Sequence, residues 1–294
     1  MRSYYGSSKN REYFEGWYFR QQVDGQAVAL IPAMHIDAAG QRSASIQIIT
    51  NRFADRVIYP IEAFHAREDS LSVTIGGSQF SEEGIIANIR TDRLEIKGKL
   101  IYGTFVRPKY DIMGPFRYLP NMQCRHSVIS IAHTVWGSLS INGEELLFEN
   151  ACGYLEGDRG SSFPGRYLWT QSMLAGGISV MLSVADIPYA GKVFCGIIGF
   201  VYMGGSEYRI ATYLGAKVER VEKHIVSVRQ GEYLLQAEVL QENPTPLYAV
   251  QHGSMSRMIK ESPSARVRYR FYKKGRAVFD QVGGCAGYEN EYGL

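Results

Sequence analysis

The amino-acid sequence predicts an all-β protein, and three observations support that fold class. Aromatic residues make up 12% of the 294 residues, and there are 31 glycines. Short runs of β pattern recur along the whole chain, whereas no long amphipathic helical pattern appears. Turn dipeptides such as Asp24-Gly25 and Asn142-Gly143 separate these runs. Many short strands between Gly-rich turns are typical of antiparallel sandwiches and barrels.

The expected strands form two series along the chain. The first series is residues 12–22, 27–36, 43–50, 57–64, 71–75, 84–89 and 94–105. The second is residues 126–133, 135–141, 145–150, 167–175, 178–185, 193–203, 208–214, 216–221, 224–229 and 233–239, with a closing hairpin at 265–282. Asn142-Gly143 predicts a two-residue hairpin turn, and Lys274-Gly275 predicts the turn of the closing hairpin. Residues 253–260 fit either a short helix or a strand.

Residues 107–125 interrupt the series. This segment carries three prolines and no periodicity. Loops of this length in a compact domain are often lids or binding loops, although some only cross the end of a barrel. Both interpretations stay open.

Two internal echoes predict a duplication. Residues 15–21 resemble residues 166–171, since both contain a Trp and precede an apolar strand. The hairpin that ends in residues 151–158 resembles the one that ends in 285–291, and both carry a Gly-Tyr pair near an acid. Two matches in the same order indicate a tandem repeat. We therefore expect two domains, residues 1–160 and 161–294.

Charge and hydropathy argue against nucleic acid and membrane-spanning helices. The formal net charge is only +3, whereas nucleic-acid-binding proteins concentrate Lys and Arg on one face. The densest basic stretch, residues 266–276, alternates in a way that predicts the solvent face of one strand. The N-terminus has no apolar core behind Arg2, and the longest apolar run, residues 193–203, is too short for a spanning helix. We therefore expect a cytoplasmic protein.

The sequence offers no signature of a cofactor or metal site. The P-loop, the Gly-rich dinucleotide motif, Gly-x-Ser-x-Gly and His-Glu-x-x-His are all missing. Cys124, Cys152, Cys195 and Cys285 lack the spacing of paired metal ligands, so we expect buried thiols. No cofactor and no metal are expected.

Acidic and aromatic residues gather in two places. Residues 156–171 include Glu156 and Asp158 and fit either a charged connector, in which arginines pair with the acids, or part of a site. Near the N-terminus, Glu15 shares a strand face with Trp17, because alternate residues of a strand point to the same side. Burial raises the pKa of such a carboxyl, and a neutral carboxyl can act as a general acid. The alternative is a rim Glu paired with an Arg.

Three histidines are candidates for proton transfer. His126 and His133 lie seven positions apart, which predicts opposite faces of a regular strand and argues against joint metal ligation. Either could orient a substrate or relay a proton, or could be a hydrogen-bonded core histidine. The same alternatives apply to His35.

An ordered set of short motifs resembles the tocopherol cyclase family. The motifs are residues 15–19 (EGWYF), 153–158 (GYLEGD), 160–164 (GSSFP) and 169–171 (WTQ). With other segments that are similar to bacterial members, the resemblance spans residues 14 to 289. Arg159 stands where the family motif has Trp, so the resemblance does not fix the substrate.

This resemblance implies a pair of lipocalin-like β-barrels, a fold related to carotenoid hydratases and to some fungal Diels–Alder-type cyclases. The implied chemistry is acid-initiated: an acid protonates a prenyl double bond, and a phenol oxygen captures the cation in a site that excludes water. The candidate catalytic residues are Glu15, Glu156, Asp158 and His126. The candidate substrate-binding residues are Trp17, Tyr18, His35, His133, Tyr154, Phe163, Trp169 and Gln171.

The sequence thus predicts a cofactor-independent cyclase that acts on a hydrophobic, prenylated or related small molecule. Two alternatives are a hydratase of an isoprenoid double bond and a lipocalin-like carrier without catalytic activity. The expected partner is a hydrophobic small molecule and not a nucleic acid. Peripheral membrane contact and the oligomeric state stay open.

Overall fold

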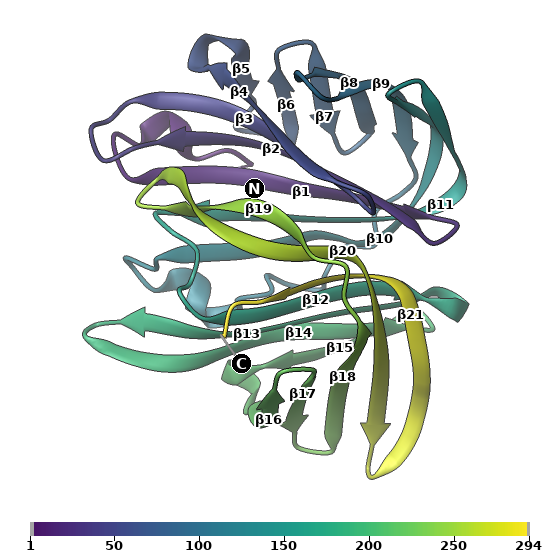
Figure 1. Cartoon of the computed structure of the whole chain (residues 1–294). Helices are drawn as coiled ribbons and strands as arrows, with labels where there is room; N and C mark the ends of the chain where they lie inside the picture. Colours follow the sequence, from purple (N-terminus) through teal and green to yellow (C-terminus); the bar gives the residue numbers. More distant parts are fainter. Residues whose placement is uncertain (1–2, 293–294) are drawn as a thin grey trace. The chain divides into compact units, whose positions relative to one another are not determined.

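The computed structural model describes residues 3–292 and consists almost entirely of antiparallel strands (Figure 1). Within these residues there is no α-helix, and the short 3₁₀ helices are η1 (Gly6–Ser8), η2 (Ile61–Ala63), η3 (Gly114–Tyr118), η4 (Ala175–Gly177) and η5 (Thr212–Leu214). The all-β prediction is confirmed. No helix in the described part of the chain has the length and apolar character needed to span a bilayer.

Within residues 3–292, eleven strands form the first sheet. They are β1 (Tyr13–Val23), β2 (Gln26–Ile36), β3 (Arg42–Thr50), β4 (Ala54–Pro60), β5 (Phe64–Ala66), β6 (Ser72–Ile75), β7 (Ser78–Ser81), β8 (Gly84–Arg90), β9 (Glu95–Tyr102), β10 (Cys124–Ile141) and β11 (Glu144–Gly160). Their order is β4-β3-β2-β1-β11-β10-β9-β8-β7-β6-β5. Because β1 pairs with β11, the sheet wraps into a nearly closed barrel.

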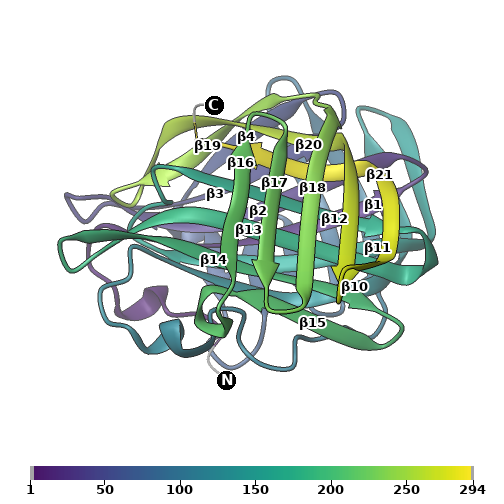
Figure 2. The ribbon, with the colours of Figure 1, turned by 90° about the horizontal axis from the view of Figure 1, so that it is seen from below.

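In the described part of the chain, the second sheet contains ten strands. They are β12 (Tyr167–Leu174), β13 (Ile178–Tyr189), β14 (Lys192–Met203), β15 (Ser206–Ala211), β16 (Lys217–Glu222), β17 (Ile225–Gln230), β18 (Tyr233–Gln241), β19 (Thr245–Gln251), β20 (Ser254–Lys273) and β21 (Arg276–Asn290). Their order is β15-β14-β13-β12-β21-β20-β18-β17-β16, with β19 paired to β20. Figure 2 shows β16, β17 and β18 side by side.

The two sheets repeat one strand order, which agrees with the duplication expected from the sequence. In each sheet the first strand lies between the second strand and the last strand, β1 between β2 and β11, and β12 between β13 and β21. The strand register changes which residues of the two repeats correspond. Gln21 lies opposite Gly153 and Gln171 lies opposite Gly287, so Trp169 occupies the place of Phe19 rather than that of Trp17.

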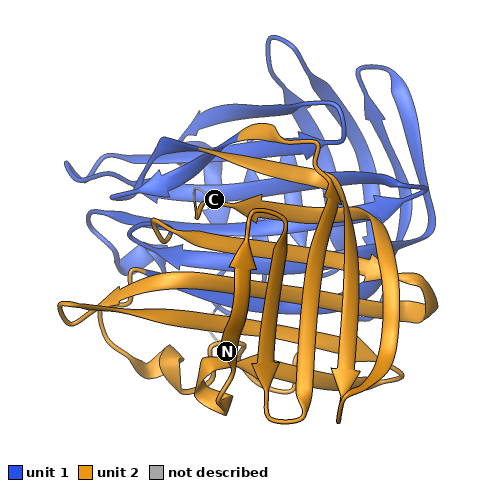
Figure 3. Cartoon of the chain, turned by 60° about the horizontal axis from the view of Figure 1, so that its bottom comes forward, with its two compact units in different colours: residues 1–107, 124–163, 247–258 blue, residues 108–123, 164–246, 259–294 orange. Residues whose placement is uncertain are grey.

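The chain divides into two compact units that differ from the two continuous halves expected (Figure 3). Unit 1 comprises residues 1–107, 124–163 and 247–258, and unit 2 comprises residues 108–123, 164–246 and 259–294. The sheets change between β11 and β12, close to the expected boundary at residue 160. The long loop and the β19–β20 turn are the two segments that group with the other unit.

Each unit has its own apolar core. In unit 1 the core includes Phe19, Leu30, Ile46, Phe80 and Leu155. In unit 2 it includes Val180, Leu182, Val228, Tyr269 and Phe271. Burial of these alternating strand residues supplies the main stabilisation of each sheet.

The turn dipeptides act as the sequence predicts. Asn142 and Gly143 have φ of 52° and 85°, and Lys274 and Gly275 have φ of 51° and 74°. Positive φ at both central residues is the requirement of the favoured two-residue hairpin turn. Residues 253–260 lie in β20 and are therefore strand.

Several other expectations needed correction. Residues 126–141 form one long strand and not two, because β-bulges keep β10 paired to β11 throughout. β7 and β19 are strands that the sequence pattern did not predict. β19 contains Pro246, and proline is unusual in a strand. Cys285 is buried, as expected, but Cys152 and Cys195 are exposed. In residues 266–271, Val267, Tyr269 and Phe271 are buried between the arginines, which confirms the solvent face predicted there.

Candidate active site

Strands β10 and β11 bring one histidine and two acids to the same place in unit 1. His126 lies directly opposite Asp158, and Val128 lies opposite Glu156. Cross-strand partners share a face, as do residues two apart on one strand. The side chains of His126, Asp158 and Glu156 therefore project from one face of the sheet.

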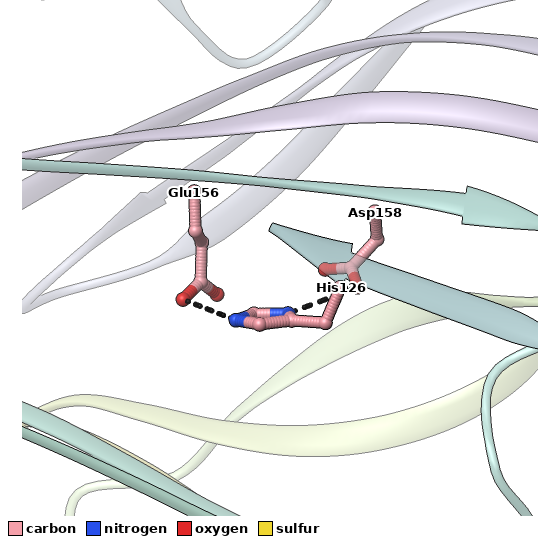
Figure 4. Close-up of side chains that lie close together, drawn as sticks. All are labelled: His126, Glu156 and Asp158. Atoms are coloured by element: carbon pink, nitrogen blue, oxygen red, sulfur yellow. Dashed lines mark hydrogen bonds and ion pairs between the residues drawn. The ribbon is translucent and has the colours of Figure 1, made fainter. Parts of the chain in front are cut away.

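The imidazole of His126 lies between the two carboxylates (Figure 4). Its Nδ1 is 3.0 Å from Oδ1 of Asp158, and its Nε2 is 3.4 Å from Oε2 of Glu156. All three side chains are largely buried, with 14% of His126, 7% of Glu156 and 16% of Asp158 exposed. A charge pair in such a place is weakly screened by solvent.

The electrostatics favour the protonated form of His126. Burial by itself lowers the pKa of the imidazole, but the charges of Asp158 and Glu156 and hydrogen bonding to both outweigh burial and raise the pKa well above 6.5. The ring therefore carries a proton on each nitrogen at neutral pH. One face of the sheet thus holds a buried imidazolium with an anionic partner on either side.

Two further groups contact the acids. The Tyr154 hydroxyl donates to Oε2 of Glu156 at 2.6 Å, and Sγ of Cys124 is 3.5 Å from Oδ1 of Asp158. Burial and the neighbouring carboxylates raise the pKa of both the Tyr154 phenol and the Cys124 thiol. Both groups therefore stay protonated and act as donors to the carboxylates. The sequence predicts Cys124 only as a buried thiol and not as a neighbour of Asp158; its position two residues before His126 was the available signal.

The same three side chains are the candidate ligands for a metal ion. One ligand atom from each of His126, Glu156 and Asp158 lies within 4.8 Å of the others. The sequence predicts no metal site, because no single segment has the spacing of metal ligands. The cluster forms only when β10 pairs with β11. Since both ring nitrogens of His126 face a carboxylate, the arrangement found is one that holds a proton.

The structure places Glu15 and Trp17 on the other face of β1. Gly16 lies opposite Asp158, whereas Glu15 lies opposite Arg159 and Trp17 belongs to the core of unit 1. Glu15 and Trp17 share a face, as expected, but that face is not the face of His126. Oε2 of Glu15 accepts from the backbone N–H groups of Tyr5 and Gly6 and from the Tyr13 hydroxyl, at 2.9 to 3.0 Å.

Through these hydrogen bonds, Glu15 holds the N-terminal segment against β1. Burial raises the pKa of its carboxyl, and the three donors and Arg159 oppose that effect. Arg159, where the family motif has Trp, stacks over the Tyr5 ring at 4.2 Å. The residue that departs from the motif therefore helps to fix the same segment.

His133 and His35 lie apart from the cluster. His133 is opposite Gly153, five positions from Asp158, so it points to the other face from His126, as predicted. Its ring packs against Tyr102 and Phe105 with centroids 4.5 and 4.6 Å away, and burial lowers its pKa to about 3. Nε2 of His35 is 3.0 Å from the Ser45 hydroxyl, and burial lowers the pKa of His35 to about 3.

The remaining candidates divide between the units. Tyr18 lies opposite Glu156 and so shares the face of the cluster, and the Phe163 ring stacks on Phe14 at 5.2 Å. In unit 2, Trp169 and Gln171 share one face of β12 and are both buried.

Arg20 is a residue that sequence reasoning missed. It lies opposite Tyr154 on the face of the cluster and is 1% exposed. The available signal was a lone Arg directly after the aromatic run Trp17–Phe19.

No family model matches the sequence, and no curated protein matches it. Solved structures do match. A protein of Nitrosomonas europaea assigned as AttH has 12% identity and a TM-score of 0.57, over 95% of this chain and 93% of that one. Kievitone hydratase from Nectria haematococca has 8% identity and a TM-score of 0.55, over 98% and 93%. CghA with Sch210972 has 10% identity and a TM-score of 0.61, over 95% and 88%. These matches confirm the lipocalin-like fold.

Proposed function

We propose that this protein catalyses acid-initiated addition to a carbon–carbon double bond of a hydrophobic small molecule. The observation that carries the proposal is the His126 imidazole held between Asp158 and Glu156 in a largely buried setting. Kievitone hydratase, which shares the fold, is named for the addition of water. The motifs that resemble the tocopherol cyclase family include both acids.

In the proposed step, the proton on Nε2 of His126 passes to one carbon of the double bond. A carbon–hydrogen bond forms, and the other carbon becomes a cation. Asp158 holds Nδ1–H and so fixes the ring, a positioning role. The negative charge of Glu156, and nearby aromatic faces such as that of Tyr18, stabilise the cation.

The nucleophile decides the product. An oxygen of the same molecule closes a ring, loses its proton to the His126–Glu156 pair and gives an isomer of unchanged mass. A water molecule that attacks the cation gives a product heavier by one water. Both outcomes return the proton, so the enzyme needs no cofactor.

The test begins with a lipid extract of the host, incubated with the purified protein in D₂O. We expect a product of unchanged skeleton mass or one heavier by one water, with one deuterium on carbon delivered from the exchanged imidazolium. A ligand recovered without chemical change would indicate a carrier instead. Activity should survive a chelator, and chelator-sensitive activity would support a metal at the same three residues.

The variants His126→Gln, Glu156→Gln and Asp158→Asn test the assignment. Removal of a general acid costs about 10²–10⁴-fold in rate, and we expect His126→Gln to fall in that range. The matched control is His65→Gln, because His65 is an exposed histidine of the same unit. If Glu156→Gln and Asp158→Asn both retain full turnover, the cluster is not the catalytic site.

A further inference from the structure

A polar pocket of about 250 Å³ lies in unit 1. Strands β2, β3 and β4 and the turn between β19 and β20 line it, and its polar side chains include those of His35, Ser45, Arg42 and Arg56. The turn is fixed tightly: N–H of Gly253 donates to the Ser161 carbonyl at 2.7 Å. Gly253 has φ of +75°, and a Cβ there would lie 1.9 Å from the Ile36 carbonyl oxygen. Only glycine fits this wall of the pocket.

The pocket has an excess of positive charge. Arg42 and Arg56 line it, against a single acidic residue, Asp37. Among the residues that the structure describes, neither arginine forms an ion pair with a carboxylate. Oδ1 of Asp37 accepts instead from the backbone N–H of Gln41 at 2.8 Å.

The orientation of the Arg56 side chain is set by its neighbours. Its guanidinium stacks over the Tyr248 ring at 4.0 Å, and its Nη1 is 3.4 Å from the Met255 carbonyl. Tyr248 is itself held by two hydrogen bonds of 3.0 Å between its backbone and the Gln47 side chain. A stacked guanidinium keeps its planar edge available for a carboxylate or a similar oxyanion.

Neutral hydrogen-bonding groups complete the pocket. His35 and Ser45 are 4% and 2% exposed and contact each other. Nδ1 of His35 is buried and has no hydrogen-bond partner within residues 3–292. A buried polar atom of this kind usually indicates a missing partner.

One row of residues connects the pocket to the catalytic cluster. Asp158 lies opposite Gly16, Gly16 opposite Ala33, and Ala33 opposite Ser45. These residues share one face, and three strand intervals of about 4.8 Å separate Asp158 from Ser45 by about 14 Å. The two central positions of the row carry the smallest side chains, and Gly16 is only half-buried.

We propose that this pocket binds a carboxylate, or a similar delocalised oxyanion, at one end of the substrate. The apolar part of the substrate then crosses Gly16 and Ala33, between Phe14 and Tyr18, and its double bond reaches His126. This inference rests on the proposed function and adds the class of substrate: a hydrophobic molecule that carries an acidic group at the end remote from its double bond.

The experiment compares dodecanoate with dodecanol by isothermal titration calorimetry, without turnover. Wild-type protein should bind dodecanoate more tightly than dodecanol. Arg56→Gln should weaken dodecanoate binding about tenfold or more, since a hydrogen bond to a charged group is lost, and should leave dodecanol unchanged. Arg42→Gln is the second variant, in case Arg56→Gln melts early. The control is Arg52→Gln, because Arg52 is exposed and pairs with Glu144 at the surface.

A second comparison tests the row of small residues. A Cβ at Gly16 would lie 3.0 Å from the Cβ of Ala33. Gly16→Val should therefore lower the affinity for dodecanoate but leave the affinity for the shorter hexanoate unchanged. Equal affinity for dodecanoate in the wild type and both arginine variants would overturn the proposal that this pocket binds the carboxylate. Calorimetry measures binding without turnover, so the result does not depend on whether His126 is the catalytic acid. Likewise, loss of turnover in His126→Gln would not support the pocket if the pocket fails to bind dodecanoate.

Discussion

His126 shows how two carboxylates on one strand reverse the usual effect of burial. Burial favours the neutral ring, as it does at His35 and His133, where the pKa falls to about 3. At His126 the pKa rises, because the carboxylates of Asp158 and Glu156 face its two nitrogens. The three histidines share a side chain and a buried setting, and only the neighbouring charges separate their protonation states.

The raised pKa of His126 predicts the pH dependence of activity. The protonated ring is the active form, so activity should persist at pH values above 6.5 and decline only as the pH passes the raised pKa. In Asp158→Asn one carboxylate is lost, so the alkaline decline of kcat/KM should move to lower pH. A pH–rate profile of both proteins measures this shift. An alkaline limb at the same pH in both would contradict the role of Asp158.

Glu15 should contribute to stability rather than to chemistry. Its carboxyl accepts three hydrogen bonds on the core face of β1, so Glu15→Gln should lower the free energy of unfolding by about 1–3 kcal/mol. Urea unfolding measures that loss, with the exposed Glu62→Gln as the control. A large loss of turnover in a stably folded Glu15→Gln would restore Glu15 as a catalytic acid.

At the scale of elements, the bulges in β10 determine which residues meet. Register shifts occur between Val128 and Ser130 and between Ser130 and His133, so an offset of seven positions on β10 corresponds to an offset of five positions on β11. Because the offset on β11 is odd, His126 and His133 lie on opposite faces. The bulged strand thus supplies one histidine to the cluster and one to the core of unit 1.

The loop at residues 108–123 is held in unit 2 by Arg209. This side chain donates to the carbonyls of Tyr110 and Asp111 at 2.9 and 3.0 Å and to the Tyr213 hydroxyl at 3.0 Å. Its ion pair with Glu207 is almost fully buried. These contacts favour an ordered loop over a simple flexible crossing.

Arg209→Met should therefore release this loop. Loss of about 1.4 kcal/mol of local stability makes an opened state tenfold more populated, so tryptic cleavage at Lys109 or Arg117 should accelerate about tenfold or more. Limited proteolysis with mass analysis of the fragments gives the rate. The control is Arg220→Met, whose ion pair with Glu222 is exposed. Equal cleavage rates in Arg209→Met and wild type would show that Arg209 does not hold the loop.

At the scale of the whole molecule, the free energy of unfolding should depend on pH through the two buried neutral histidines, His35 and His133. The unfolded chain binds a proton on each near pH 6.5, whereas the folded protein binds it only near pH 3. Stability should therefore fall as the pH drops through this window, by about 1 kcal/mol per pH unit for each histidine. Denaturant unfolding from pH 7 to pH 4 should show a shallower decline in His133→Gln. If the free energy of unfolding of His133→Gln falls with pH as steeply as that of the exposed control His65→Gln, the prediction is wrong.

The repeated strand order was partly readable from the sequence. The echoes around the Trp-bearing and Gly-Tyr segments identified the first and last strands of each sheet. The register then moved the match by two residues, because Gln21 and Gln171 hold the equivalent places. Two residues is one full period of a strand, so a shift of this size keeps every side chain on its face and leaves no trace in the pattern of alternation.

The sequence by itself determined what depends on local chemistry: the all-β class, the positions of the Asn142-Gly143 and Lys274-Gly275 turns, and the shared face of Glu15 and Trp17. Turn dihedrals and strand alternation are properties of neighbouring residues, so they can be read locally. Tertiary structure alone decided that His126 meets Asp158 and Glu156, because a strand pairing more than thirty residues distant sets that contact. The pairing of β1 with β11 separated Glu15 from the cluster, and the pairing of β2 with β1 and β3 aligned Gly16 and Ala33 with the polar pocket. Register, and not composition, selects which residues lie side by side.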